Sequence, residues 1–142
     1  MSPTHTCNLV HCVFGTKDRA NLIAEPERLW QYVGGIARQK NVLLLAVSGT
    51  ENYLHLLISL PPTMTLAEVV QDIKGNTSKW LGPRFAWQEG YSAFSVSQSP
   101  RQRVIDYIDG QAEHHKKWSF EQEYLALLKK SGIAYDERFV LG

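Results

Sequence analysis

The sequence predicts an α+β fold, and three observations support this prediction: short apolar runs, amphipathic stretches with helix caps, and the order in which the two alternate. Apolar runs at 7–14, 42–47 and 53–60 have the length and the flanking turn residues of strands. The whole order is β-α-β-β-α-β followed by added C-terminal helices. This is the order of the split βαβ or ferredoxin-like fold, so we expect an antiparallel sheet with two helices on one face.

The first half of the chain supplies a strand, a helix and a pair of strands. Pro26 begins a helical pattern in which apolar residues recur three and four positions apart. The glycine pair at 34–35 weakens this helix by about 1 kcal/mol per glycine relative to alanine. The runs at 42–47 and 53–60 are predicted to pair antiparallel, and prolines at 61–62 end the second because proline cannot donate to a strand ladder.

The second half begins with another helix. Thr65 and Glu68 form a capping-box pattern, and Gly82 with Pro83 stops the helix that this box opens. The stretches 85–87 and 91–96 are interpreted as a hairpin or as one bent edge strand. Four aromatic side chains in this half are expected in the core rather than as platforms for base stacking: Trp80, Trp87, Tyr91 and Phe94.

Two more helices are predicted towards the C-terminus. Ser99 caps the first of them, with Gln102 three residues after the cap. Ser119 and Gln122 repeat this pattern for the last helix, which ends at Gly132.

Composition and charge indicate one globular domain, residues 1–142. The chain has 15 Lys+Arg against 14 Asp+Glu, a net charge of +1, and 44% hydrophobic residues. No apolar run approaches the ~18 residues of a membrane span, and no signal-peptide pattern is present, so we expect a cytoplasmic protein without a membrane partner. The charge balance counts against sequence-blind nucleic-acid binding at high salt, but it allows a local cluster of Lys and Arg.

Two pairs of residues are candidates for chemistry. Strand alternation places Tyr53 and His55 side by side on the sheet face that the two helices leave open. A lone histidine on a strand is more often structural than catalytic. Tyr107 and Gln111 lie four residues apart, hence on one face of the third helix. This spacing is equally typical of an ordinary amphipathic helix.

Several motifs follow one another in an order that is typical of one enzyme family. They lie at 52–57, 61–62, 73–81, 87–96 and 107–111, with histidines at 114–115. Together they resemble the single-strand DNA transposases of bacterial insertion sequences, the insertion-sequence-two-hundred-like family of the HUH (His-hydrophobic-His) nuclease superfamily. The resemblance runs from the first strand to the tail.

The resemblance implies a metal-dependent tyrosine transposase, a single-strand endonuclease of DNA transposition and recombination. By position, Tyr107 is the nucleophile that forms a 5′-phosphotyrosine link, and His55 and Gln111 are ligands of a divalent metal, Mg²⁺ or Mn²⁺. The implied substrate is single-stranded DNA with hairpins at the element ends. The implied assembly is a homodimer in the bacterial cytoplasm.

One residue departs from the family pattern. Tyr53 stands where the first histidine of the HUH motif belongs. A neutral phenol with a pKa near 10 is a poor ligand for Mg²⁺ or Mn²⁺. Two hypotheses follow: an enzyme with a weakened site, or a transposase-derived protein that binds hairpin DNA and no longer cleaves it.

The remaining candidates are contacts with nucleic acid. The DNA-binding candidates are Tyr53, Lys17, Arg19, Lys74, Lys79, Arg84 and Arg101, although each of these cations is by default a solvated surface charge. A third hypothesis is an open-faced sheet that binds RNA with Tyr53 as its stacking residue, but no RNP-like segment supports it. Cys7 and Cys12, near His5 and His11, do not have the spacing of a zinc site.

Overall fold

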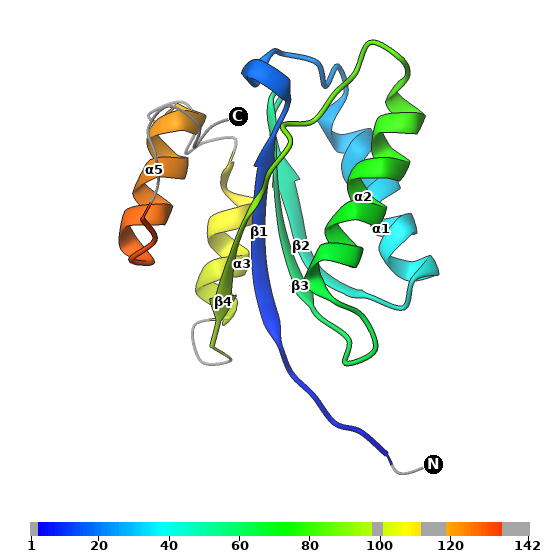
Figure 1. The fold of residues 1–142 in the computed structure, drawn as a ribbon, viewed down its shortest axis with the longest axis vertical. Coiled ribbons are helices and arrows are strands. Elements are labelled where there is room, and N and C mark those ends of the chain that lie inside the picture. The colour runs from blue at the N-terminus through cyan, green and yellow to red at the C-terminus, as the bar shows by residue number, and fades with distance from the viewer. Residues whose placement is uncertain (1–2, 98–100, 112–118, 135–142) are drawn as a thin grey trace.

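A four-stranded antiparallel sheet lies at the centre of the protein, in the strand order β2-β3-β1-β4 (Figure 1). The structure is a computed structural model that describes residues 3–97, 101–111 and 119–134. The strands are β1 (Leu9–Gly15), β2 (Leu43–Gly49), β3 (Tyr53–Ser59) and β4 (Ser92–Val96). Together with the helices between them they follow the predicted β-α-β-β-α-β order, so the α+β, split βαβ prediction is confirmed.

Helices α1 (Pro26–Gln39) and α2 (Leu66–Leu81) cover one face of this sheet (Figure 1). Strand β3 directs Leu54, Leu56 and Ile58 into this layer, as the alternation predicts. The helices meet them with apolar side chains that include Leu29, Val33, Val69, Val70 and Ile73. Each fully buried side chain of this size contributes roughly 1.5–3 kcal/mol, so this layer is the main source of hydrophobic stabilisation.

The predicted helix signals are present in this layer. Thr65 and Glu68 form the capping box at the start of α2, and Gly82 ends the helix with φ of 103°, a backbone conformation that favours glycine. The glycine pair at 34–35 stays inside α1, and apart from the helix's own neighbouring backbone no atom lies within 4 Å of where a Cβ would stand at either position. Tertiary packing of the apolar face therefore outweighs the low helix propensity of that pair.

The second face of the sheet is covered, and the expectation of an open face is wrong. Helices α3 (Arg101–Asp109) and α5 (Phe120–Lys130) lie on this side, opposite α1 and α2 (Figure 1). Two clusters of buried side chains form beneath them. The first contains Leu9, Ala46, Leu57 and Ile108, and the second contains Val13, Tyr53, Phe120 and Tyr124. The apolar side chains of both helices and of this sheet face are removed from water together, which is the physical reason for the covering.

The segment before β4 is not a strand. Only residues 92–96 pair with β1, and Trp87 makes one isolated bridge with Thr16, so the hairpin alternative is wrong and a short edge strand remains. Trp87 is buried against Phe14, as expected of a core residue. Trp80 and Tyr91 are 41% and 36% exposed, so the prediction that they belong to the core is wrong.

Several predicted features lie at the edges of the described residues. The cap at Ser99 and the histidines at 114–115 fall outside them. The capping box of Ser119 and Gln122 at the start of α5 is confirmed. Among the residues that the structure describes, no helix is both long and apolar enough to span a membrane.

Candidate functional site

Strands β1 and β3 bring two histidines together on the face beneath α3 and α5. In the antiparallel register Val13 pairs with His55 and His11 pairs with Leu57, so the two histidines are diagonal neighbours. The Nε2 atom of His11 lies 2.8 Å from Nδ1 of His55, and the rings stack with centroids 5.0 Å apart. Sequence reasoning considered His11 only as a neighbour of the cysteines. The available signal was a polar residue inside an otherwise apolar strand.

Helix α5 adds a buried carboxylate to this pair. The Oε1 atom of Glu123 lies 2.6 Å from Nε2 of His55, and the two residues are 2% and 0% exposed. Nδ1 of His55 thus faces His11, and Nε2 faces Glu123 in a short contact that lacks hydrogen-bond geometry. Sequence reasoning missed Glu123, which sits within the apolar stripe of α5 between Phe120 and Leu127. An acidic residue at such a position on an amphipathic helix was the signal that could have found it.

Tyr53 joins the sheet to Gln111, two residues beyond the end of α3, instead of facing solvent. Its hydroxyl donates a hydrogen bond to Oε1 of Gln111 at 3.1 Å, and its ring stacks on Phe120 with centroids 4.9 Å apart. Tyr53 and Gln111 are both fully buried. Burial and, next, the charge of Glu123 raise the pKa of Tyr53, so its phenol stays neutral. The predicted role of Tyr53 as a stacking platform on an open face does not hold in this structure.

Tyr107 lies over the two histidines. Its ring stands edge-on to both, with its centroid 6.0 Å from that of His55 and 6.2 Å from that of His11. Burial, the charge of Glu123 and a hydrogen bond with Glu123 raise the pKa of Tyr107, and a hydrogen bond with Gln111 opposes them. Gln111 also donates from Nε2 to the backbone carbonyl of Tyr107 at 3.1 Å. The phenol is thus neutral and needs a proton acceptor before it can act as a nucleophile.

The structure thus brings together all the residues that the sequence assigned to the chemistry, and it adds two. Tyr107, His55 and Gln111 meet beneath α3 and α5, and His11 and Glu123 complete the cluster. All five lie within one chain. We call these five residues the tyrosine cluster.

The tyrosine cluster does not fit a divalent cation as it lies. Both nitrogens of His55 are engaged by His11 and Glu123, and Oε1 of Gln111 accepts from Tyr53. Within the described residues, no group of three or more His, Cys, Asp or Glu is placed to hold a metal ion. A metal would need these side chains to release their present partners first.

Most of the predicted DNA contacts lie away from this cluster. Lys74 donates to the carbonyls of Gln88, Glu89 and Gly90 at 2.9, 3.3 and 2.6 Å, and burial lowers its pKa. These bonds hold the loop before β4 and leave Lys74 little freedom to bind phosphate. Of the other predicted contacts, Lys17, Lys79 and Arg84 are exposed, and Arg101 is half-buried at the start of α3.

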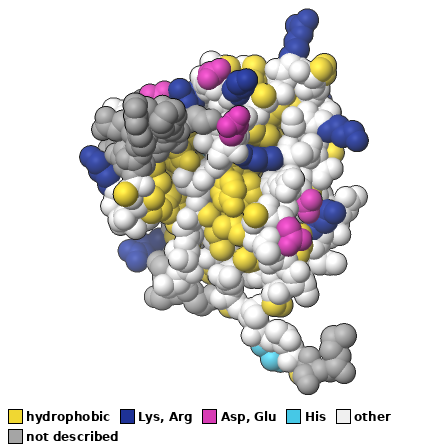
Figure 2. Space-filling view, viewed as in Figure 1, with side chains coloured by type: hydrophobic (Ala, Val, Ile, Leu, Met, Phe, Trp, Pro, Cys, Tyr) yellow, Lys and Arg dark blue, Asp and Glu magenta, His cyan; other side chains and the backbone are white. Residues whose placement is uncertain are grey.

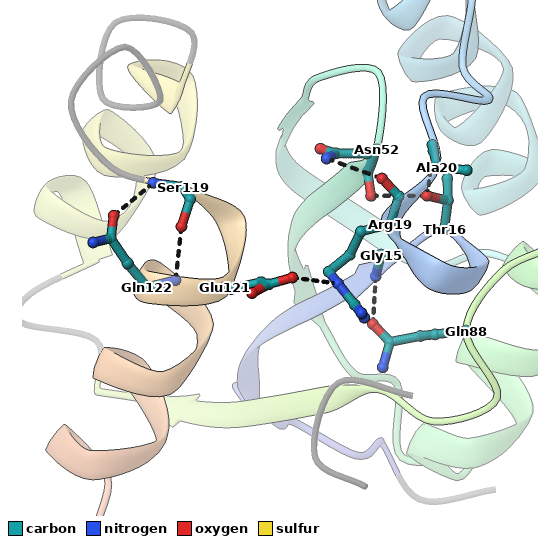
Figure 3. A network of polar contacts seen from close by, with 9 residues as sticks. All are labelled: Gly15, Thr16, Arg19, Ala20, Asn52, Gln88, Ser119, Glu121 and Gln122. Atoms are coloured by element: carbon teal, nitrogen blue, oxygen red, sulfur yellow. Dashed lines mark hydrogen bonds and ion pairs between the residues drawn. The ribbon is translucent and has the colours of Figure 1, made fainter. Parts of the chain in front are cut away.

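Arg19 fixes the loop after β1 to helix α5. Its Nε lies 2.6 Å from Oε1 of Glu121, in a network where Asn52 donates to the carbonyl of Arg19 (Figure 3). Thr16 and Gly15 anchor the same loop through bonds to Ala20 and Gln88. This ion pair lies at the surface, with the Arg19 and Glu121 side chains 26% and 53% exposed, so it contributes little to the position of α5.

The comparison with known families is decisive on one point. Residues 4–111 match the family model described as "Transposase IS200 like". The chain belongs to the IS200-like transposase family. The matched segment carries His11, His55, Tyr107 and Gln111, whereas α5 with Glu123 lies beyond it.

Individual relatives agree with this family. The chain is 28% identical over 121 residues to the transposases for insertion sequence element IS200 of Salmonella typhimurium and Salmonella typhi, covering 75% of this chain and 78% of each relative. A crystal structure from Deinococcus radiodurans assigned as a transposase has a TM-score of 0.61 at 22% identity, covering 78% of this chain and 96% of that one. A REP-associated tyrosine transposase bound to a REP hairpin has a TM-score of 0.63 at 15% identity. The match covers 96% of this chain and 93% of that one. At these identities the two solved structures support the fold.

Proposed function

We propose that this transposase cleaves and rejoins single-stranded DNA at hairpin-bearing element ends, with Tyr107 as the nucleophile. The observation that carries the proposal is the position of Tyr107 against a buried carboxylate and two histidines, on the helix where the family resemblance puts the nucleophile. The proposed partner is a DNA single strand with a hairpin, in the bacterial cytoplasm.

In the proposed reaction the tyrosine cluster serves both cleavage and rejoining of the DNA strand. The phenol oxygen of Tyr107 attacks the scissile phosphorus, and its proton passes to the Glu123 carboxylate. The bond between phosphorus and the 3′-oxygen breaks, and Glu123 passes the proton on to the departing 3′-oxygen. The products are a 5′-phosphotyrosine and a free 3′-hydroxyl. In rejoining, a 3′-hydroxyl attacks the phosphotyrosine and the proton returns to Tyr107. The phosphotyrosine stores the broken bond, so no ATP is needed.

Each of the other cluster members has a proposed task in this reaction. His55 holds Glu123 towards Tyr107, and His11 holds His55 from the opposite side. Gln111 fixes the last turn of the tyrosine helix through its bond to the backbone of Tyr107. Tyr53 in turn fixes the orientation of the Gln111 amide.

Two features implied by the family resemblance stay predictions. One is the requirement for Mg²⁺ or Mn²⁺, held by His55 and Gln111, which the present side-chain contacts do not favour. The other is the homodimer, for which light scattering of the purified protein is the direct measurement. The cluster lies within one chain, so we expect cleavage activity to survive under conditions where the protein is monomeric.

A second candidate function is hairpin DNA binding without cleavage. The observation that favours it is Tyr53, which occupies the position of a metal-ligand histidine and is buried against Phe120. The RNA-binding alternative loses its basis, because α3 and α5 cover the sheet face that it requires.

One assay distinguishes the first two functions. Labelled hairpin single-stranded DNA is incubated with the wild type, Tyr107→Phe and Tyr53→His, with Mn²⁺ and with EDTA, and covalent adducts are separated on denaturing gels. An adduct with the wild type that Tyr107→Phe abolishes supports the transposase. An adduct with Tyr53→His alone supports the binding protein and contradicts cleavage by the natural chain.

A further inference from the structure

A cavity of about 630 Å³ lies between β4, α3 and α5, next to the tyrosine cluster. Its volume is within the range of roughly 300–1,000 Å³ that is usual for small-molecule sites. Tyr107, His11 and Glu123 reach the cavity from the cluster. The cavity is therefore continuous with the candidate site, although none of the DNA contacts predicted from the sequence lines it.

The walls of this cavity combine charge with apolar surface. Arg103 from α3 and Lys130 from α5 line it and are exposed, whereas Glu123 is 2% exposed. The cations therefore stand at the mouth and the carboxylate stands deep inside, paired with His55. Phe94 and Leu127 add aromatic and aliphatic surface to the wall.

Figure 2 shows the outer surface on the side of α3 and α5. On the side formed by α3 and α5, Lys and Arg side chains flank a patch of hydrophobic side chains. Helix spacing explains the alignment of the charged groups. Arg103 precedes Tyr107 by four residues, so both lie on one face of α3, and Lys130 follows Glu123 by two turns on α5.

We propose that this cavity binds one unstacked nucleotide of the DNA strand, with its phosphate at Arg103 and Lys130 and its base against Phe94. The inference deepens the proposed function and rests on it. Guanidinium and ammonium groups bind phosphate oxygens, and an aromatic face is sequence-tolerant because every base has a π-face. A phosphate held by Arg103 lies along the same helix face as the Tyr107 hydroxyl, where the nucleophile needs it.

The proposed nucleotide site implies a preference for single strands. A nucleotide enters it only when the base has left its stack and its pair. A single strand meets this condition without cost from base pairing, whereas a duplex does not. We therefore expect the cavity to select the unpaired nucleotides beside a hairpin rather than the hairpin stem.

The first test is a binding titration of a fluorescein-labelled single strand, followed by anisotropy. Arg103→Ala and Lys130→Ala are each expected to weaken binding about tenfold, as the loss of a charge-assisted hydrogen bond does. Each should lower the slope of log K against log salt by about 0.7, the value for one phosphate contact on a single strand. Lys129→Ala is the matched control, since Lys129 is exposed on the same helix and does not line the cavity, and it should change affinity less than twofold.

A second variant tests the cavity without removing charge. Ala126 lines the cavity from an exposed position on α5, so Ala126→Trp should fill it and leave the helix intact. We expect this variant to lose single-strand binding about tenfold or more, while circular dichroism shows the wild-type melting curve. An altered melting curve removes Ala126→Trp from the comparison, and the two charge variants then decide.

The outcomes separate this inference from the proposed function. If the wild type binds and Arg103→Ala and Lys130→Ala match Lys129→Ala, the nucleotide site is wrong and the transposase proposal stands. If those variants weaken binding and no Tyr107 adduct ever forms, the nucleotide site stands and the cleavage proposal is wrong. If the wild type binds no single-stranded DNA, both are wrong.

Discussion

Nε2 of His55 lies 2.6 Å from Oε1 of Glu123, a buried contact that joins the central strand β3 to the last described helix. His55 alone would be a histidine on a strand, with no clear task. With Glu123 on one side and His11 on the other, it belongs to a polar chain in an apolar layer. Such a chain is costly to bury unless every member has a partner, and this requirement gives α5 one specific position on the sheet.

Glu123→Gln should slow adduct formation by Tyr107 about 10²-fold, the scale of a lost general base, while the protein stays folded. The amide keeps the shape of the carboxylate but cannot accept the phenol proton. The measurement is the rate of covalent adduct with labelled single-stranded DNA. Glu121→Gln is the control on the same helix, because Glu121 is exposed and pairs with Arg19. Equal rates for Glu123→Gln and the wild type would exclude Glu123 as the proton acceptor.

Tyr53→Phe should lower the free energy of unfolding by about 1 kcal/mol, because it removes the hydroxyl that Gln111 accepts and leaves a buried amide oxygen without a donor. The ring and its stack on Phe120 stay, so the packing is unchanged. Urea unfolding of the two proteins measures the difference. A variant as stable as the wild type would mean that the hydrogen bond between Tyr53 and Gln111 adds nothing to the free energy of unfolding.

The free energy of unfolding should fall as the pH drops from about 6.5 towards 3. Burial and then the neighbouring His55 lower the pKa of His11 to about 3, so the folded protein keeps His11 neutral where the unfolded chain takes up a proton. The unfolded state binds more protons in this window, which lowers stability by about 1.4 kcal/mol per pH unit from this group. Stability from this source is fully present above pH 6.5.

The pH experiment compares wild type and His11→Gln by urea unfolding at steps between pH 4 and 7. The variant lacks the titrating imidazole, so its stability should depend less on pH than that of the wild type. Parallel curves for the two proteins would contradict a buried neutral His11.

Mn²⁺ should leave the melting temperature of the DNA-free protein unchanged. A cation that binds the folded state raises the melting temperature with concentration, and here the ring nitrogens of His55 are already engaged by Glu123 and His11. Differential scanning fluorimetry from micromolar to millimolar Mn²⁺ is the measurement, with EDTA as the reference. A saturable rise at low Mn²⁺ would show that the cluster opens readily for a metal.

Local signals made much of the fold predictable. The capping boxes at Thr65 and Ser119 and the period-two alternation of β3 act over a few residues, and the structure has them where they were expected. The covered second face was not predicted. The sequence of β1 is a nearly continuous apolar run, and periodicity alone does not tell whether such a short run is covered on one face or on both; the structure shows it buried on both.

The sequence by itself determined the order of the elements and the capping boxes of α2 and α5, because these depend on spacing over a few residues. The assignment of His55, Tyr107 and Gln111 as site residues came from the family motifs and stays a prediction. Only the tertiary structure decided that His11 and Glu123 join them. His11 is 44 positions from His55, and Glu123 comes from a helix outside the matched family segment. Such contacts arise when α5 buries its apolar side against the sheet, and no local pattern specifies which polar groups then meet.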